Sequence, residues 1–263
     1  MYLCVSLIFI FLYIQLIFTN KITKDSSLFD TCNIPEIDSY ITQGEFQKHF
    51  VGKDFRLSKP VVFRQIPINK QFRELIKLDS ILKRYGNKHI TVTTANTYSY
   101  KKQSMKLNEY IQLQIDKNPS KQSKWGNETV YWFGDDLFHD QTWLNQILKY
   151  YQHPPYTVDD FIQPSSTFGM GGQGTGVPFH FHGPGFQQMI YGRKRWYLSL
   201  EKPSFDPNET TLEWAIERRF KSPQPLLYEC TLNRGDVIFF PNLWWHATLN
   251  LDFAMFLSTF LSL

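Results

Sequence analysis

The C-terminal half of the chain is divided into short apolar runs by turn-forming residues. Beyond residue 155, these turns include Gly171-Gly172, Gly183-Pro184-Gly185 and Arg234-Gly235-Asp236. Short strands separated by Gly and Pro at this spacing are typical of an all-β sandwich or barrel. An aromatic content of 17% suits such a fold, because aromatic side chains favour strands and bury large areas. The sequence therefore predicts a mainly β fold for this half.

The preceding residues mix helix and strand patterns. Thr42 and Glu45 have the spacing of a capping box, which predicts the start of a short helix. Residues 70–85 carry apolar side chains at helical spacing and predict one helix. Further helix or strand patterns occupy residues 59–63, 89–94, 106–115, 129–133 and 140–151. We therefore expect an α+β region ahead of the β fold.

The start of the chain has the composition of a secretory leader. Residues 3–18 are apolar apart from Ser6 and Gln15. This run is slightly short for a membrane span of about 20 residues and suits the apolar segment of a signal peptide. The sequence predicts a signal peptide at residues 1–19, with an uncleaved signal anchor as the alternative. Once the leader is removed, we expect no stable insertion into a membrane.

Cysteines and glycosylation signals agree with a secretory route. Removal of the leader takes Cys4 with it and leaves Cys32 and Cys230. In an oxidising compartment the sequence favours one disulfide between these two cysteines, with two free thiols as the alternative. Asn127 and Asn208 each begin an Asn-X-Thr sequon, the acceptor signal for N-glycosylation. Leader and sequons jointly predict a glycoprotein of the secretory pathway.

Three histidines are candidate metal ligands. His180 and His182 lie in the run VPFHFHGPGF at 177–186, and in a strand they project from the same face. His246 follows an apolar segment that begins at a Gly-Asp turn and ends in two tryptophans. Strands far apart in sequence meet in a barrel, so the three imidazoles could bind one metal ion. The alternative is that they are hydrogen-bonded residues of the core.

Lys194 is the second chemical feature of this half. If residues 190–198 form one strand, Lys194 shares a face with Ile190, Trp196 and Leu198 and is the only charge there. A buried ammonium without a partner is costly, so such a lysine is usually paired with an anion. That anion is either a carboxylate of the protein or a bound acid.

These segments, in this order, resemble the JmjC and cupin-like oxygenases. The resemblance implies a double-stranded β-helix, the jelly roll of the cupin and JmjC type, over residues 126–263. Residues 20–125 are then an N-terminal α+β region packed on the barrel. The resemblance also implies Fe(II) and 2-oxoglutarate as cofactors. Within the family, the resemblance is strongest to a member of the endoplasmic reticulum lumen, and it extends through residues 94–100 and 131–135. We therefore expect this chain in the lumen of the endoplasmic reticulum or secreted from the cell.

The resemblance implies a role for each candidate residue. His180 and His246 match the metal-binding histidines of the family, and Lys194 matches the lysine that pairs with the far carboxylate of 2-oxoglutarate. His182 departs from the pattern, because the family places Asp or Glu there to complete a two-histidine, one-carboxylate site. Val177 also departs, since several relatives have a hydroxyl residue that helps to hold 2-oxoglutarate.

Two functions follow from this pattern. One is a Fe(II)/2-oxoglutarate-dependent dioxygenase that hydroxylates a protein substrate. The other is a catalytically silent protein of the same fold, a pseudoenzyme that acts as a lumenal binding or regulatory scaffold for a protein partner. The leader and sequons oppose nuclear histone demethylation. The 28 basic and 24 acidic residues form no basic stripe, which argues against nucleic acid as a partner.

Overall fold

The computed structural model of the chain describes residues 29–94, 101–115, 130–133, 142–217 and 226–263. Three features predicted from the sequence lie outside these ranges. They are the leader at residues 1–19, the sequon at Asn127 and the boundary between residues 125 and 126. Of the helices that the structure describes, none has the length and apolar character needed to cross a membrane.

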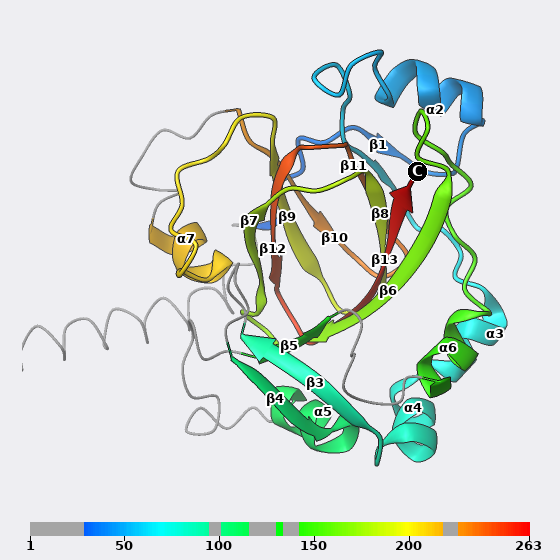
Figure 1. Cartoon of the computed structure of the whole chain (residues 1–263), viewed down its shortest axis with the longest axis vertical. Helices are drawn as coiled ribbons and strands as arrows, with labels where there is room; N and C mark the ends of the chain where they lie inside the picture. Colours follow the sequence, from blue (N-terminus) through cyan, green and yellow to red (C-terminus); the bar gives the residue numbers. More distant parts are fainter. Residues whose placement is uncertain (1–28, 95–100, 116–129, 134–141, 218–225) are drawn as a thin grey trace, which may run out of the picture.

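Eight consecutive strands form a jelly roll of two facing layers (Figure 1). One layer has the order β11-β8-β13-β6 and the other the order β10-β9-β12-β7, with antiparallel neighbours throughout. Apart from β9 and β10, which pair with each other in the second layer, consecutive strands alternate between layers, as in a double-stranded β-helix. The predicted mainly β jelly roll is confirmed. The strands are β6 Gln163–Gly171, β7 Gly176–His180, β8 Gly185–Tyr191, β9 Lys194–Ser199, β10 Tyr228–Leu232, β11 Val237–Phe240, β12 Trp245–Asn250 and β13 Ala254–Ser262.

The N-terminal region widens the first layer at both edges into a nine-stranded sheet. Strand β2 pairs with β11 and carries β1, whereas β5 pairs with β6 and leads on to β3 and β4. Main-chain hydrogen bonds therefore join this region to the barrel, in addition to side-chain packing. These strands are β1 Glu36–Ile37, β2 Val61–Phe63, β3 His89–Thr94, β4 Lys102–Lys106 and β5 Val130–Phe133.

Helices cover the outer faces of both layers (Figure 1). The capping box of Thr42 and Glu45 is present at α2, and Thr210 and Glu213 form a second one at α7. The helix predicted at residues 70–85 is instead two helices, because the extended residue Lys77 separates them and lets both turn an apolar side to the sheet. The helices are α2 Gln43–Phe50, α3 Lys70–Leu75, α4 Leu78–Tyr85, α5 Leu107–Ile115, α6 Thr142–Leu148 and α7 Thr211–Glu217.

The alternation of side chains along each strand separates an inner core from an outer one. Inward side chains meet between the layers, and most of them are aromatic or large and apolar. Outward side chains of β6, β8 and β13 pack under helices α3 to α6. The buried inner cluster includes Met189, Trp196, Leu198, Cys230, Leu232, Ile238, Phe240, Trp244, Ala254 and Phe256.

The prediction of a single strand over residues 190–198 is wrong. Strand β8 ends at Tyr191 and β9 begins at Lys194 in the opposite layer. Gly192 has φ +72°, and a Cβ there would overlap the carbonyl oxygen of Phe253. The glycine therefore allows the chain to pass from one layer to the other. Lys194, Trp196 and Leu198 still share one face, whereas Ile190 packs in the outer core.

The N-terminal segment is bound to the second layer close to a disulfide. Cys32 and Cys230 are joined across 198 residues of sequence. The buried guanidinium of Arg195 pairs with Glu229 at 2.8 Å and donates hydrogen bonds to the carbonyl oxygen of Phe29 and the hydroxyl of Thr31, both at 3.0 Å. This segment is thus held by a covalent bond and by a buried ion pair with its hydrogen bonds.

Candidate metal centre

The three predicted histidines meet at one end of the barrel. His180 ends β7 and lies directly opposite His246 of β12 in the antiparallel ladder. His182 lies in the turn after β7, where its carbonyl oxygen accepts a hydrogen bond of 2.9 Å from the amide of Leu243. This bond ties the His182 turn to the turn that precedes β12. Two neighbouring strands of one layer and one hydrogen bond between turns therefore position the three side chains.

Each imidazole has its Nδ1 atom hydrogen-bonded to a main-chain carbonyl. The Nδ1 atoms of His180, His182 and His246 lie 2.8, 2.8 and 2.9 Å from the carbonyl oxygens of Pro178, Gly183 and Trp244. A carbonyl only accepts, so Nδ1 carries the proton in each ring and Nε2 presents a lone pair. Fixing the Nδ1 proton in this way orients a metal-binding histidine.

One ring nitrogen from each of the three histidines belongs to a single cluster. The candidate ligand atoms all lie within 4.8 Å of one another, and the Nε2 atoms of His182 and His246 are 3.2 Å apart. Two lone pairs at this distance repel unless a cation lies between them. A metal ion about 2.1 Å from each nitrogen would place the nitrogens about 3.0–3.4 Å apart, for angles between right and tetrahedral. The donor set therefore fits a divalent metal ion.

Burial keeps these imidazoles neutral. It lowers the pKa of His180 to about 4 and also lowers the pKa of His182. The pKa of His246 falls well below its usual value, first because of burial and then because of the two neighbouring histidines. A neutral imidazole is the form that binds a metal. The centre is thus prepared for a cation without first losing protons at neutral pH.

Aromatic rings cover the inner side of this centre. Phe240 stacks on His246 with ring centroids 5.2 Å apart, and Trp196 lies behind it, 5.5 Å from Phe240. Phe260 packs edge-on against His182 at 5.0 Å. Such a shell excludes water from the inner face of a metal site. The sequence shows these residues as apolar strand positions but does not show which of them contact the histidines.

Lys194 projects into the barrel but meets a ring in place of an anion. Its side chain is buried, and Nζ lies 3.1 Å from the centroid of Phe256. Among the described residues it has no carboxylate partner and no hydrogen bond, and burial lowers its pKa well below the usual value. Phe256 could not be predicted from the sequence, because nothing in the apolar run of β13 distinguishes the residue that faces the lysine.

The residues around Lys194 do not fit 2-oxoglutarate as the resemblance implies. A carboxylate paired with Nζ would need the space that the Phe256 ring occupies. At the other predicted position, Val177 lies opposite Thr248 and offers no hydroxyl; its amide donates to the Thr248 hydroxyl at 3.3 Å. The structure therefore supports a metal site more strongly than a cosubstrate site.

One exposed and two half-buried aromatic residues lie together on the outer face of the layer that carries the centre. Phe181, between two of the histidines, is 50% exposed and packs edge-on against Trp245 with ring centroids 4.8 Å apart. Phe205 lies 5.8 Å from the Trp245 ring, and the amine of Lys202 is 5.4 Å from it. Aromatic side chains are enriched at protein interfaces. This aromatic surface, formed by Phe181, Trp245, Phe205 and Lys202, adjoins the metal centre.

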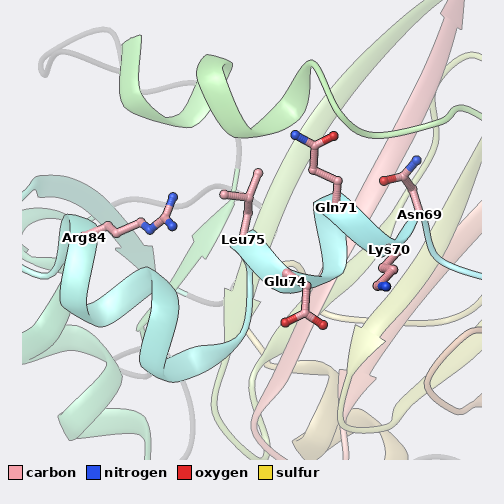
Figure 2. Close-up of a pocket in the computed structure, with 6 residues that line it drawn as sticks. All are labelled: Asn69, Lys70, Gln71, Glu74, Leu75 and Arg84. Atoms are coloured by element: carbon pink, nitrogen blue, oxygen red, sulfur yellow. The ribbon is translucent and has the colours of Figure 1, made fainter.

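Two further features lie apart from the centre. Asn208, the sequon residue that the structure describes, is exposed in the turn before α7. A surface hollow of about 530 Å³ lies along α3 and reaches Arg84 of α4 (Figure 2). Charged and amide side chains line most of this hollow, and none of the three histidines contributes to it. Its lining residues are Asn69, Lys70, Gln71, Glu74, Leu75 and Arg84.

Comparison with protein families gives one match that includes the whole centre. The JmjC domain family matches residues 154–262, a range that contains all eight strands of the jelly roll. His180, His182, His246 and Lys194 all lie within it. The fold and the position of the histidines therefore agree with the family that the sequence resembles.

Comparison with individual proteins gives relatives along most of the chain. JmjC domain-containing protein 8 of Mus musculus is 40% identical over 237 residues, which cover 88% of this chain and 83% of the mouse protein. The Homo sapiens protein of the same name is 39% identical over 226 residues, which cover 84% of this chain and 81% of the human protein. The bifunctional arginine demethylase and lysyl-hydroxylase psr-1 of Caenorhabditis elegans is 23% identical; the match covers 82% of this chain and 57% of that protein.

Proposed function

This chain belongs to the JmjC domain family, and we propose that it is a metal-binding member that acts on or with a protein partner in the secretory pathway. The observation that carries the proposal is a cluster of three histidine ring nitrogens within 4.8 Å of one another, in which every Nδ1 atom is bonded to a carbonyl and the Nε2 atoms of His182 and His246 are 3.2 Å apart. Three neutral, fixed imidazoles at one point are a ligand set for a divalent cation.

Fe(II) is the metal that the family implies for this centre. When bound, it would supply a redox-active Lewis acid next to the exposed aromatic surface. Three imidazoles leave both charges of the ion uncompensated, whereas a carboxylate in place of His182 would cancel one of them. We therefore propose weaker binding of Fe(II) than at a two-histidine, one-carboxylate site, and competition from Zn(II) and Cu(II), for which imidazole is a good ligand.

A binding or regulatory role is the function that the site supports best. The contact between Lys194 and Phe256 favours it, because the ring lies directly against the amine that would have to pair with the carboxylate of the family's cosubstrate. Protein hydroxylation is the second candidate. It is favoured by the psr-1 relative, whose name states lysyl hydroxylation, and by the intact set of three metal-binding side chains.

The proposed partner is a polypeptide that contacts the aromatic surface. Phe181 and Trp245 are covalent neighbours of the metal-binding histidines, and because successive side chains of a strand point to opposite faces, their rings lie on the outer face of the layer that carries the centre. Exposed aromatic side chains supply much of the binding energy at protein interfaces. The proposal places the metal centre and the binding surface at the same end of the barrel.

The proposed compartment is the lumen of the endoplasmic reticulum or the extracellular space. A disulfide between Cys32 and Cys230 is stable in an oxidising compartment, and Asn208 is exposed for glycan transfer. Expression of the full chain in cultured eukaryotic cells tests this. Endoglycosidase should increase the electrophoretic mobility of the wild-type protein, and the combined Asn127→Gln, Asn208→Gln variant should not respond. An unglycosylated wild-type protein would count against the compartment.

Metal analysis of the purified chain tests the central proposal. The protein, loaded anaerobically with Fe(II) and desalted, should retain about one equivalent, and His182→Ala should retain much less. His153→Gln is the matched control, since this exposed histidine lies away from the centre near Thr259 and Ser166. Retention of no Fe(II), Zn(II) or Mn(II) by the wild type would refute the metal site. Consumption of 2-oxoglutarate would favour the hydroxylase.

A further inference from the structure

We infer that Phe256 occupies the position at which a dicarboxylate would meet Lys194, so that the barrel binds a metal ion but excludes 2-oxoglutarate. This inference rests on the proposed metal-binding function and concerns a different part of the barrel. Phe256 is then the residue that determines whether this jelly roll accepts the cosubstrate of its family.

The first support is the surroundings of the Lys194 amine. Its Nζ is centred on the face of the Phe256 ring at 3.1 Å, which is the position for a cation–π contact. Both side chains are buried, and among the residues that the structure describes no acidic group pairs with this lysine. The aromatic face thus takes the place of the anion that an isolated buried ammonium needs.

The second support is that the Phe256 ring is confined. It lies on Gly169 of the neighbouring strand β6, and a Cβ at that position would overlap two of the ring atoms. On another side the Phe133 ring packs against it, with centroids 5.7 Å apart. Because residue 169 has no side chain, there is space for the Phe256 ring. The residues packed around this ring oppose its rotation away from the lysine.

The third support is a continuous series of aromatic rings between Lys194 and the metal centre, the two places that a bound 2-oxoglutarate would have to reach. From Lys194 the contacts run through Phe256, Phe133 and Phe260 to His182. A 2-oxoglutarate molecule that pairs with Lys194 at one end and reaches the metal at the other would have to displace rings along this line. One substitution at Phe256 opens the end where its carboxylate would bind.

Calorimetric titration with 2-oxoglutarate tests the inference on the full chain loaded with Mn(II), an air-stable substitute for Fe(II). We expect no measurable binding to the wild type. Phe256→Thr should bind 2-oxoglutarate with a dissociation constant at least about tenfold below the weakest binding that the titration can detect, because it removes the ring and supplies a hydroxyl. Lys194→Ala added to Phe256→Thr should abolish the gain. Leu257→Thr is the matched control, since it changes the next residue of the same strand, whose side chain packs in the outer core away from the lysine.

Three outcomes decide the inference. A gain at Phe256→Thr that depends on Lys194 supports it. Binding by the wild type that is lost in Lys194→Ala overturns it, with or without metal. Failure of both Phe256→Thr and the more conservative Phe256→Leu to gain binding, with unfolding midpoints showing that at least one is folded, also overturns it. Metal content is measured separately. A protein without metal would refute the proposed function, whereas binding of 2-oxoglutarate that depends on Lys194 would still test the role of Phe256.

Discussion

His182 determines the charge of the proposed centre. It presents a neutral Nε2 lone pair 3.2 Å from that of His246, at the position where the family resemblance implies a carboxylate. A carboxylate would contribute a negative charge and a harder oxygen ligand, which Fe(II) and Mn(II) accept more readily than a third imidazole. The identity of this one side chain therefore sets both the affinity and the preference for the metal.

The substitution His182→Asp should strengthen binding of Mn(II) by at least about tenfold, because it adds the missing negative ligand. His182→Asn is the control, since it has the same size without the charge, and it should bind no more tightly than the wild type. Equilibrium titration with Mn(II), followed by electron paramagnetic resonance, measures the free ion. Equal affinities for the Asp and Asn variants would contradict the charge argument.

Lys194 contributes an unfavourable charge to the barrel interior. The variant Lys194→Met should unfold at higher urea, with a gain of about 1–3 kcal/mol, because an apolar chain of similar length replaces a buried ammonium that has no carboxylate partner among the described residues. Lys202→Met, at an exposed position, is the control and should change the free energy of unfolding by less than about 0.5 kcal/mol. A loss of stability in Lys194→Met would show that the charge has a stabilising partner.

The same lysine should give a pH signature. Burial lowers the pKa of Lys194 well below 10.5, so between that lowered value and 10.5 the unfolded chain binds more protons than the folded one. Stability of the wild type should therefore rise with pH through this window, and the rise should be smaller in Lys194→Met. Urea midpoints measured from pH 7 to pH 10 test this. Parallel curves for the two proteins would contradict it.

At the scale of elements, local signals predicted the helix starts and the strands more reliably than the places where the chain changes direction. The capping box at Thr42 predicted α2, because its hydrogen bonds form within four residues. The break at Lys77 and the turn at Gly192 were missed, because each depends on which surface the following residues must cover. The histidines were found from strand periodicity, whereas Phe256 depends on the register between β13 and β6.

The turn at Gly192 yields a prediction about one element. Gly192→Ala should lower the free energy of unfolding by about 2 kcal/mol or more, because the residue has φ +72° and the new Cβ would overlap the Phe253 carbonyl. Gly44→Ala is the matched control. It lies in α2 with nothing within 4 Å of the added Cβ, and it should raise stability by about 0.5–1 kcal/mol. Equal effects of the two substitutions on the urea midpoint would show that the chain tolerates a side chain at this turn.

At the scale of the whole molecule, the N-terminal segment holds the two layers of the barrel together. Its strand β1 pairs with β2 at the edge of the nine-stranded sheet. A few residues earlier, Arg195 and Cys230 of the other layer bind the same segment. Residues 29–37 therefore connect both layers next to β10, and the disulfide is the covalent part of this connection.

Loss of the disulfide should weaken the entire fold, because it closes a loop of 198 residues in the unfolded chain. Loop-closure entropy gives a stabilisation of about 5 kcal/mol as an upper value, and about 2–4 kcal/mol is typical of measured disulfides. We expect Cys32→Ser to lower the free energy of unfolding by an amount in this range, measured by urea denaturation without reductant. Dithiothreitol should lower the wild-type midpoint to that of the variant and leave the variant unchanged, because both then lack the same bond. A wild-type midpoint that is insensitive to reductant and equal to that of Cys32→Ser would show that the N-terminal segment is held by the Arg195 contacts and strand pairing alone.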